Sequence, residues 1–331
     1  NPPNADGVIE DFLGLFMDLP NLIRLMEDGA PGAFSASEIE RAWDWTRRQR
    51  TRLYDWLSGE KEESAELDEE DDALFLRLWQ MRVGKLRAPG RGRQPLRYAH
   101  MVVDEVQDLS PVEVAVLLDT VDNRTSVTLS GDTQQHIIEQ AGFTDWRTFF
   151  GDIGAGETSV NTLKVSYRST HEITSFARRV LGDLVEDDAP PTTTRPGAPV
   201  EFFRFTDDGA CVAFLASSLM ELVRREPLAS IAVLTPNPAI SAIYARGLRL
   251  GEVPRVRLVL DQEFAFSAGI DVTEVNEVKG LEFDYVVLVE VNASYYPDDS
   301  HARRLLHVGA TRAAHQLWLT SVGEPSPILN D

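Results

Sequence analysis

From residue 99 to the end of the chain, short apolar runs alternate with segments long enough for helices, and this alternation constrains the fold most. The apolar runs are rich in Val, Leu and Ile, and we expect strands at 100–104, 126–129, 200–205, 230–235, 256–260, 285–291 and 316–320. Helix-length segments lie between them, at 111–121, 170–185, 209–225, 238–250 and 301–313. Strands that alternate with helices are typical of parallel sheets covered on both faces. The sequence therefore predicts an α/β fold with two lobes, preceded by a mainly helical region.

Residues 1–98 have a different texture, helical and irregular. Ser35 and Glu38 have the spacing of a capping box that opens a helix. That helix interleaves arginines with tryptophans, which is typical either of a surface on which nucleic-acid bases stack or of a plain solvated basic face. An acidic run follows at 60–72, and then a basic, Gly-containing stretch at 82–97. We expect the acidic run to be solvated, and the basic stretch to be a loop that contacts phosphates or an acidic protein surface.

The charge balance limits the partners. With 53 acidic and 32 basic side chains, the formal net charge is -21. Proteins that grip nucleic acid non-specifically are usually basic, so a local basic track must meet nucleic acid here, or the main partner is a protein. The single cysteine, Cys211, excludes a disulfide framework and fits a reducing compartment. No apolar run reaches the roughly 18–20 residues of a membrane span, so we expect a cytoplasmic protein without a membrane partner.

Two adjacent carboxylates, Asp104 and Glu105, follow an expected buried strand. Such a pair suits magnesium–nucleotide chemistry, because one carboxylate organises the metal and the next orients or deprotonates the attacking water. The next expected strand leads into the turn 131–135, Gly-Asp-Thr-Gln-Gln. Parallel strands end at the same edge of a sheet, so this turn should lie beside the carboxylates. A glutamine there can sense a γ-phosphate or hold the water; the structural alternative is a simple Gly-Asp turn.

Three later segments carry arginine, glycine and glutamate at the ends of expected elements. They lie at 165–169 before a helix, at 279–284 before a strand, and at 308–313 within a helix. The planar guanidinium of Arg168 or Arg312 suits a phosphate chain, because its donors match phosphoryl oxygens. Each arginine alone would more often be a surface ion pair. Five such segments in this order are not independent accidents.

These five segments resemble the motifs of UvrD/Rep-type superfamily 1 helicases. Motifs II to VI correspond to DEVQD at 104–108, GDTQQ at 131–135, SYRS at 166–169, VKGLEFD at 278–284 and VGATRA at 308–313. The resemblance covers residues 98–322. The sequence around motif II is most similar to the DNA helicase IV / HelD-type branch. Some members of that branch act on RNA polymerase instead of unwinding duplexes.

The resemblance implies roles for residues of the first lobe. Asp104 would hold Mg²⁺, Glu105 would activate the hydrolytic water, and Gln135 would couple the state of the γ-phosphate to movement. Two positions depart from the family pattern. Ser166 replaces the usual Asn, and Asn276 stands where motif V commonly has His, which puts strand contact at that point in doubt.

The resemblance also implies how the second lobe would meet ATP. Tyr167 would stack on the adenine, and Arg168 would touch the γ-phosphate. Gly280 would let the backbone approach the nucleotide, and Glu282 would form a hydrogen bond with the ribose. Arg312 would be the arginine finger.

A Gly-rich phosphate loop with Lys and Ser/Thr is missing from these motifs. The nearest spacing match, 151–158, has Glu157 in place of the lysine, and we expect it to be a loop that joins the lobes. The chain begins with Asn1 and not Met, so we expect the C-terminal portion of a longer helicase whose phosphate loop lies upstream. The alternatives are a naturally truncated relative that acts as a binding module, and a converged protein of another nucleotide-using class.

Together these observations predict three parts: a helical inserted subdomain (1–97), the rest of an incomplete first RecA-like lobe (98–160) and a second RecA-like lobe (161–331). ATP would sit between the lobes and drive movement along single-stranded nucleic acid, for which we expect DNA in preference to RNA. The parent would be an ATP-dependent DNA helicase, and the isolated chain would hydrolyse little ATP. The alternatives are a HelD-like factor that binds or remodels RNA polymerase, and a non-catalytic interaction module.

Overall fold

The computed structural model describes residues 7–8, 11, 14, 18–57, 59, 69–88, 90, 94–132, 145–156, 158–163, 165–185, 192–193 and 195–330. These residues form two compact units. The first unit contains the described residues up to Gly131 and those of 145–158. The second contains Asp132 and the described residues from Ser159 onward.

The first unit contains the helices α2 (Leu19–Gly29), α3 (Ala36–Leu57) and α4 (Glu69–Arg82), of which α2 packs against α3. The expected capping box at the start of α3 is confirmed. The Ser35 backbone N–H donates to Glu38 Oε2 at 2.7 Å, and the Glu38 N–H donates to Ser35 Oγ at 3.3 Å. Helix α4 packs on α5 (Pro111–Leu118), where Gln80 Nε2 donates to the Val116 carbonyl at 2.9 Å.

A small parallel sheet completes the first unit. Strands β1 (Met101–Val103) and β2 (Val127–Leu129) pair in parallel, and a short 3-10 helix, η1 (Val106–Asp108), follows β1. Buried Val103, Val106, Val114 and Phe149 join the sheet to α5 and to α6 (Trp146–Asp152). Helix α6 corrects one expectation: residues 151 and 152 belong to its last turn, and the described residues of 153–158 lie outside helices and strands.

The second unit is built on a six-stranded parallel sheet with the order β5-β10-β9-β6-β8-β7. Its strands are β5 (Glu201–Phe205), β6 (Ser230–Thr235), β7 (Val256–Leu258), β8 (Gly269–Glu274), β9 (Phe283–Leu288) and β10 (Ala313–Val322). Every pairing in it is parallel. The predicted α/β class with parallel sheets is therefore confirmed.

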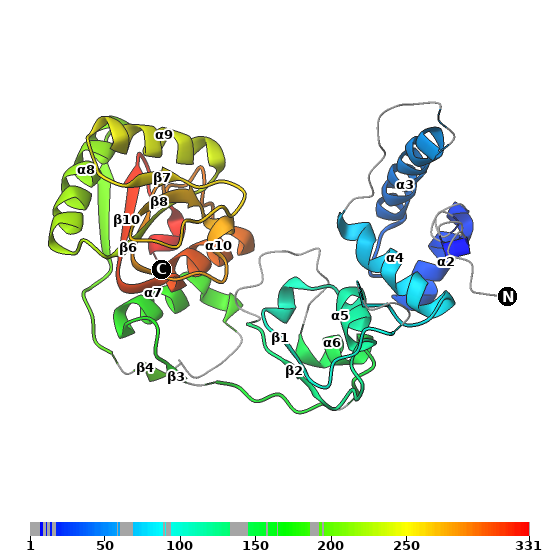
Figure 1. Cartoon of the computed structure of the whole chain (residues 1–331). Coiled ribbons are helices and arrows are strands. Elements are labelled where there is room, and N and C mark those ends of the chain that lie inside the picture. Colours follow the sequence, from blue (N-terminus) through cyan, green and yellow to red (C-terminus); the bar gives the residue numbers. More distant parts are fainter. Residues whose placement is uncertain are drawn as a thin grey trace. The chain divides into compact units, whose positions relative to one another are not determined.

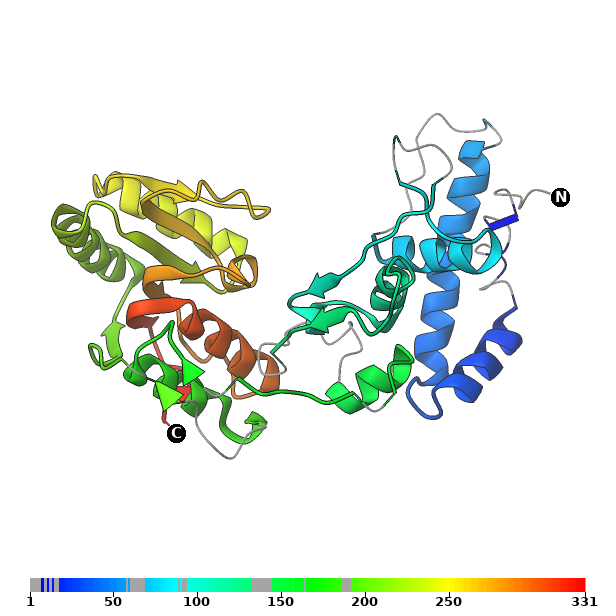
Figure 2. The ribbon, with the colours of Figure 1, turned by 60° about the horizontal axis from the view of Figure 1, so that its bottom comes forward.

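Helices cover both faces of this sheet (Figures 1 and 2). Helices α7 (His171–Leu181) and α10 (Ser300–Thr311) pack on one face, which presents Leu234, Leu288 and Leu317. Helices α8 (Asp208–Arg225) and α9 (Pro238–Leu250) pack on the other, which presents Ile231, Val233 and Val287. The alternation of residues between the two cores follows from the two-residue period of a strand.

Shorter elements complete the second unit. They are β3 (Val165–Ser166), β4 (Thr192–Thr193) and the 3-10 helices η4 (Gly182–Leu184), η5 (Val275–Val278) and η6 (Pro327–Asn330). The sequence expectation for 308–313 is wrong in one respect: α10 ends at Thr311, Arg312 caps it, and Ala313 begins β10. No helix in the described part of the chain is long and apolar enough to cross a membrane.

Candidate functional site

The carboxyl ends of β1 and β2 meet at one edge of the small sheet, as the sequence predicts. The Ser130 N–H donates to the Val103 carbonyl, and the Val106 N–H donates to the Ser130 carbonyl, both at 2.9 Å. These two bonds place Asp104 beside the turn that begins at Gly131. The Asp-Glu pair and the start of the Gly-Asp turn therefore share one edge.

Asp104 is exposed, and its carboxylate is oriented by its neighbours. Its Oδ1 accepts from Ser130 Oγ at 2.5 Å and from the Glu105 N–H at 3.0 Å. The role of Ser130 was not predicted, although a polar residue at the end of the neighbouring strand is a signal for it. The two bonds fix the carboxylate against the strand end.

Glu105 is fixed by Gln107. The Glu105 backbone is left-handed, with φ 52°, and Gln107 Nε2 donates to Glu105 Oε2 at 2.7 Å. The Gln107 side chain is fully buried beneath Gly131, where any Cβ would collide with its Oε1. Gly131 is therefore needed for close approach, and Gln107 positions the carboxylate that the sequence singles out.

This edge suits Mg²⁺ in the way that nucleotide enzymes hold it. Among the described residues, no three His, Cys, Asp or Glu side chains gather into a metal-binding group. Mg²⁺ keeps several waters and is commonly bound through one or two carboxylates and substrate phosphates, so Asp104 alone would be a sufficient protein donor and Glu105 would remain available as a base. Gln135, the third residue predicted here, lies outside the described residues.

In the second unit, the residues predicted from motifs IV and V lie together. Arg168 Nε and Glu282 Oε2 form an ion pair at 2.7 Å, although 114 positions separate the two residues (282 minus 168). Tyr167 is 71% exposed, so its ring is available for stacking. Gly280 has φ +77°, and a Cβ there would meet no atom within 4 Å. The backbone conformation, and no close neighbour, thus explains glycine at this position.

Arg312 is 1% exposed, and its guanidinium bonds to the segments around it. Nε donates to the Val308 carbonyl at 3.1 Å, and Nη1 donates to the Leu281 carbonyl at 3.2 Å. The Phe283 N–H in turn donates to the Arg312 carbonyl at 2.9 Å. Motifs V and VI are therefore tied together through Arg312; its role as an arginine finger stays a prediction.

Ser169 ties motif IV to the same place. Its buried hydroxyl donates to the Ala313 carbonyl at 2.8 Å, directly after Arg312. Ser169 belongs to the motif IV segment, but the sequence does not predict its role, because its acceptor lies 144 residues away. Arg168, Glu282 and Arg312 thus belong to one hydrogen-bonded cluster of segments.

A buried histidine lies on the inner side of α10. His307 is 7% exposed, and its Nδ1–H donates to the Ala177 carbonyl at 3.0 Å, since that oxygen can only accept. Burial lowers the pKa of His307, against the opposing influence of this hydrogen bond and of Asp132. The imidazole is therefore neutral near pH 7, which avoids adding a second charge near Arg312.

Two arginines of α3 are paired within their own helix. Arg47 and Arg48 contact Asp44 at 3.3 and 3.1 Å. Arg48 also lies over the ring of Trp45, 5.7 Å from its centroid, and Trp45 is 51% exposed. The pairing with Asp44 is typical of a solvated basic face, while the exposed ring keeps a stacking surface open as the alternative.

Comparisons with known proteins identify similar helicases. Residues 269–320 match the model of the UvrD-like helicase C-terminal domain. The ATP-dependent DNA helicases UvrD2 of Mycobacterium tuberculosis (strain ATCC 25618 / H37Rv) and Mycobacterium bovis (strain ATCC BAA-935 / AF2122/97) are 30% identical over 163 residues. That match covers 46% of this chain and 23% of each relative, so the chain spans less than a quarter of their length.

Two solved structures are also similar. The C-terminal domain of a possible DNA helicase from Lactobacillus plantarum WCFS1 matches with a TM-score of 0.41 and 26% identity, over 50% of this chain and 92% of that one. Arterivirus nonstructural protein 10, a helicase, matches with a TM-score of 0.34 and 14% identity, over 69% of this chain and 40% of that one.

The second unit is a parallel α/β domain on which motifs IV, V and VI converge. The predicted resemblance to the C-terminal portion of a UvrD/Rep-type superfamily 1 helicase is confirmed by the family match and the UvrD2 relatives. The narrower placement in the HelD-type branch has no support among these matches and stays a prediction.

Proposed function

We propose that this chain is the C-terminal motor portion of an ATP-dependent superfamily 1 helicase or translocase that moves along single-stranded DNA. One observation carries the proposal: Arg168, Glu282 and Arg312, from three distant segments, belong to one bonded cluster. A sheet-supported cluster of arginines and a glutamate suits a nucleotide that must be sensed and hydrolysed. The chain lacks a phosphate loop with lysine, so we propose that this loop lies elsewhere in the whole protein.

The first unit would supply the hydrolytic groups. Glu105 would take a proton from the attacking water at Oε1, while Gln107 holds Oε2. Asp104 would hold Mg²⁺ through water, and Mg²⁺ when bound offsets the charge of the phosphate oxygens. Gln135 would link the γ-phosphate to movement.

The second unit would supply the cations and the nucleotide contacts. Arg312 would stabilise the charge on the transferring phosphoryl group, and Arg168 would bind the γ-phosphate. Tyr167 would stack on the base and Glu282 would bond the ribose. Because Arg168 and Glu282 pair with each other here, we infer that nucleotide contact exchanges this ion pair for nucleotide bonds.

The test is DNA-stimulated ATP hydrolysis by the natural gene product. Arg312→Lys should lower kcat by about 10³-fold, and Glu105→Gln by about 10²-fold or more, because they remove a phosphoryl clamp and a general base. Asp122→Asn, an exposed carboxylate of the first unit that pairs with Arg97, is the matched control. The isolated chain should hydrolyse ATP slowly. Brisk hydrolysis by the isolated chain, or full activity of both variants, would contradict the proposal.

The net charge of -21 favours a second candidate, a factor that docks on a basic protein machine such as RNA polymerase. A salt titration of single-stranded DNA binding separates the two. Strand tracking predicts affinity that falls steeply with salt, because phosphate contacts release counterions. Absence of DNA binding at low salt would favour the protein-docking candidate. In either case the expected location is the cytoplasm.

A further inference from the structure

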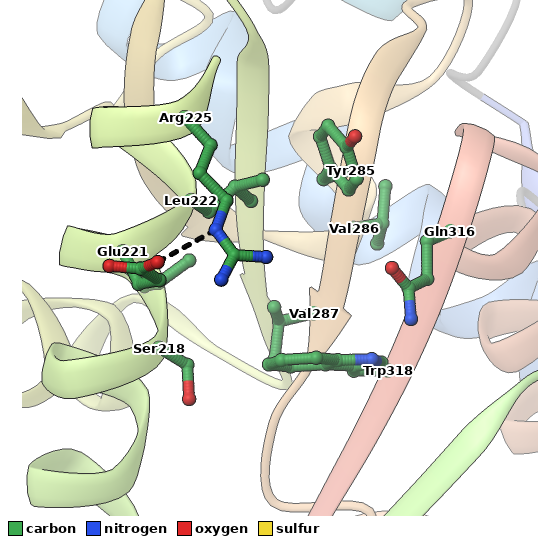
Figure 3. A pocket seen from close by; sticks show the side chains of 10 residues that line it. Ser218, Glu221, Leu222, Arg225, Tyr285, Val286, Val287, Gln316 and Trp318 are labelled. Carbon is green, nitrogen blue, oxygen red and sulfur yellow. Dashed lines mark hydrogen bonds and ion pairs between the residues drawn. The ribbon is translucent and has the colours of Figure 1, made fainter. Parts of the chain in front are cut away.

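A pocket of about 300 Å³ opens in the second unit between α8 and strands β9 and β10 (Figure 3). Leu222 and Val287 form part of its apolar wall, and Trp318 closes one end. Val287 and Trp318 belong to the core shared with α8 and α9, on the face of the sheet opposite α7 and α10. The pocket therefore lies across the sheet from the helices that follow motif IV and carry motif VI.

The aromatic end of the pocket is held in place by neighbouring side chains. The Trp318 ring contacts Phe203 and Phe214, with centroids 5.3 and 5.9 Å apart. Its Nε1 also donates to Glu201 Oε2 at 2.9 Å, so the ring is held at both its edge and its face. A volume of about 300 Å³ is at the lower limit of small-molecule sites. It suits one bulky apolar group better than a cofactor.

Two carboxylates bond to neutral donors that line the pocket. Glu226 Oε1 accepts from the Tyr285 hydroxyl at 2.7 Å. Glu201 accepts from Trp318 Nε1 and from Gln316 Nε2. No cation of the described residues pairs with Glu201 or Glu226. Burial, followed by the bond to Glu226, raises the pKa of Tyr285 to about 12, so its hydroxyl stays a donor at neutral pH.

The cations near the pocket are already engaged. Arg224 and Arg225 both bond to Glu221, at 2.6 and 2.7 Å. Figure 3 shows Glu221 and Arg225 joined along α8 at the side of the cavity. A phosphate group entering here would meet the unpaired charges of Glu201 and Glu226, whereas a cation would be attracted to them. The pocket is therefore unsuited to a nucleotide and suited to a basic ligand with an apolar body.

We propose that this pocket docks a basic segment of a partner protein, whose bulky apolar side chain enters the cavity while flanking lysines or arginines pair with Glu201 and Glu226. The site combines an apolar anchor with charged contacts at its rim, as protein interfaces do. The proposal does not depend on ATP hydrolysis, because none of these residues belongs to the nucleotide cluster.

The test measures binding of labelled hexapeptides to the full chain by fluorescence anisotropy at physiological salt. The probe is Lys-Arg-Leu-Phe-Arg-Lys, and its controls are Lys-Arg-Ser-Ser-Arg-Lys, which lacks the anchor, and Glu-Asp-Leu-Phe-Asp-Glu, which reverses the charge. The probe should bind at least about 10-fold more tightly than either control, because it alone offers both contacts.

Variants locate the binding. Glu201→Gln and Glu226→Gln should each weaken it about 2- to 5-fold, the range of exposed ion pairs. Glu252→Gln, an exposed carboxylate in the turn between α9 and β7, should leave the affinity unchanged. Leu222→Trp fills the cavity and should abolish the preference for the Leu-Phe peptide over the Ser-Ser peptide. If Leu222→Trp does not fold, the two glutamine variants still decide the outcome.

Three results would overturn the proposal. The first is equal binding of the Leu-Phe and Ser-Ser peptides, which would mean charge attraction without a pocket. The second is an equal loss in Glu252→Gln and Glu226→Gln. The third is displacement of the bound probe by ATP, with a half-displacement concentration that is lower in Glu226→Gln than in the wild type. That result would assign the pocket to a nucleotide.

Discussion

The two units differ in how their parallel sheets are covered. In the second unit both faces carry helices, and residues 231–235 of β6 are all buried. In the first unit, β1 and β2 form a two-stranded sheet, and Val102 in β1 is 64% exposed. The carboxylates of the first unit that we propose for hydrolysis, Asp104 and Glu105, are thus positioned by local bonds from Ser130 and Gln107. The arginines of the second unit rest on a sheet with two cores, so their positions depend on long-range packing.

The largest expected effect separates the stability of the two units. Leu234→Ala should lower the free energy of unfolding of the second unit by about 2–5 kcal/mol, because Leu234 is fully buried in the central strand β6. Leu118→Ala, in the smaller core of the first unit, is the matched variant and should fall at the lower end of that range. Denaturant unfolding, monitored by hydrogen exchange, measures the free energy of unfolding of each unit. Equal destabilisation of both units by Leu234→Ala would break the comparison.

A smaller effect should arise where motif IV meets motif VI. Ser169→Ala removes a buried hydroxyl and leaves the Ala313 carbonyl without that donor, which should cost about 1–2 kcal/mol in the second unit. Ser217→Ala, an exposed serine of α8, is the control and should change stability by less than about 0.5 kcal/mol. The same denaturant titration measures both. If the two serine variants are equally stable, Ser169 does not join the motifs.

The strands of the second unit illustrate what local pattern can predict. Residues 230–235 are a strand with the expected bounds, because a continuous apolar run marks a strand buried on both faces. Strand β8 was missed, because Asp271 and Glu274 interrupt its apolar run. Asp271 is nonetheless buried, since Arg257 of the neighbouring strand β7 pairs with it at 2.6 Å. A compensating charge on another strand is invisible to a local pattern.

The candidate site shows the same limit. The sequence motifs were sufficient to single out Asp104, Arg168 and Glu282, because each has a charged side chain at the end of a helix or strand. The supports Gln107 and Ser169 were not predicted, since their function is a bond to a partner that only the folded chain brings near. The sequence motifs indicate which side chains can take part in nucleotide chemistry, while tertiary packing determines how those side chains are positioned.

The smallest expected effect concerns pH. Glu290 is 5% exposed, and burial raises its pKa above the usual value of 4.5. The folded state thus favours the protonated carboxyl, and this contribution to stability is full below pH 4.5 and is lost as pH rises through the folded pKa. Between pH 5 and 8, the Tm of the wild type should fall relative to Glu290→Gln by roughly 1–2 °C. A difference in Tm that is constant across this range would contradict the assignment.

The most direct test of the central claim is the affinity of this chain for a fluorescent ATP analogue, titrated in the presence of Mg²⁺. The account predicts weak binding that Arg168→Ala reduces about 10-fold, because a charge-assisted bond to a phosphate is lost. Arg204→Ala, which removes an exposed arginine that contacts Glu324 at 4.0 Å in the same unit, should leave the affinity unchanged. Equal affinity of wild type and Arg168→Ala, or an equal loss in both variants, would contradict the assignment of this cluster to a nucleotide.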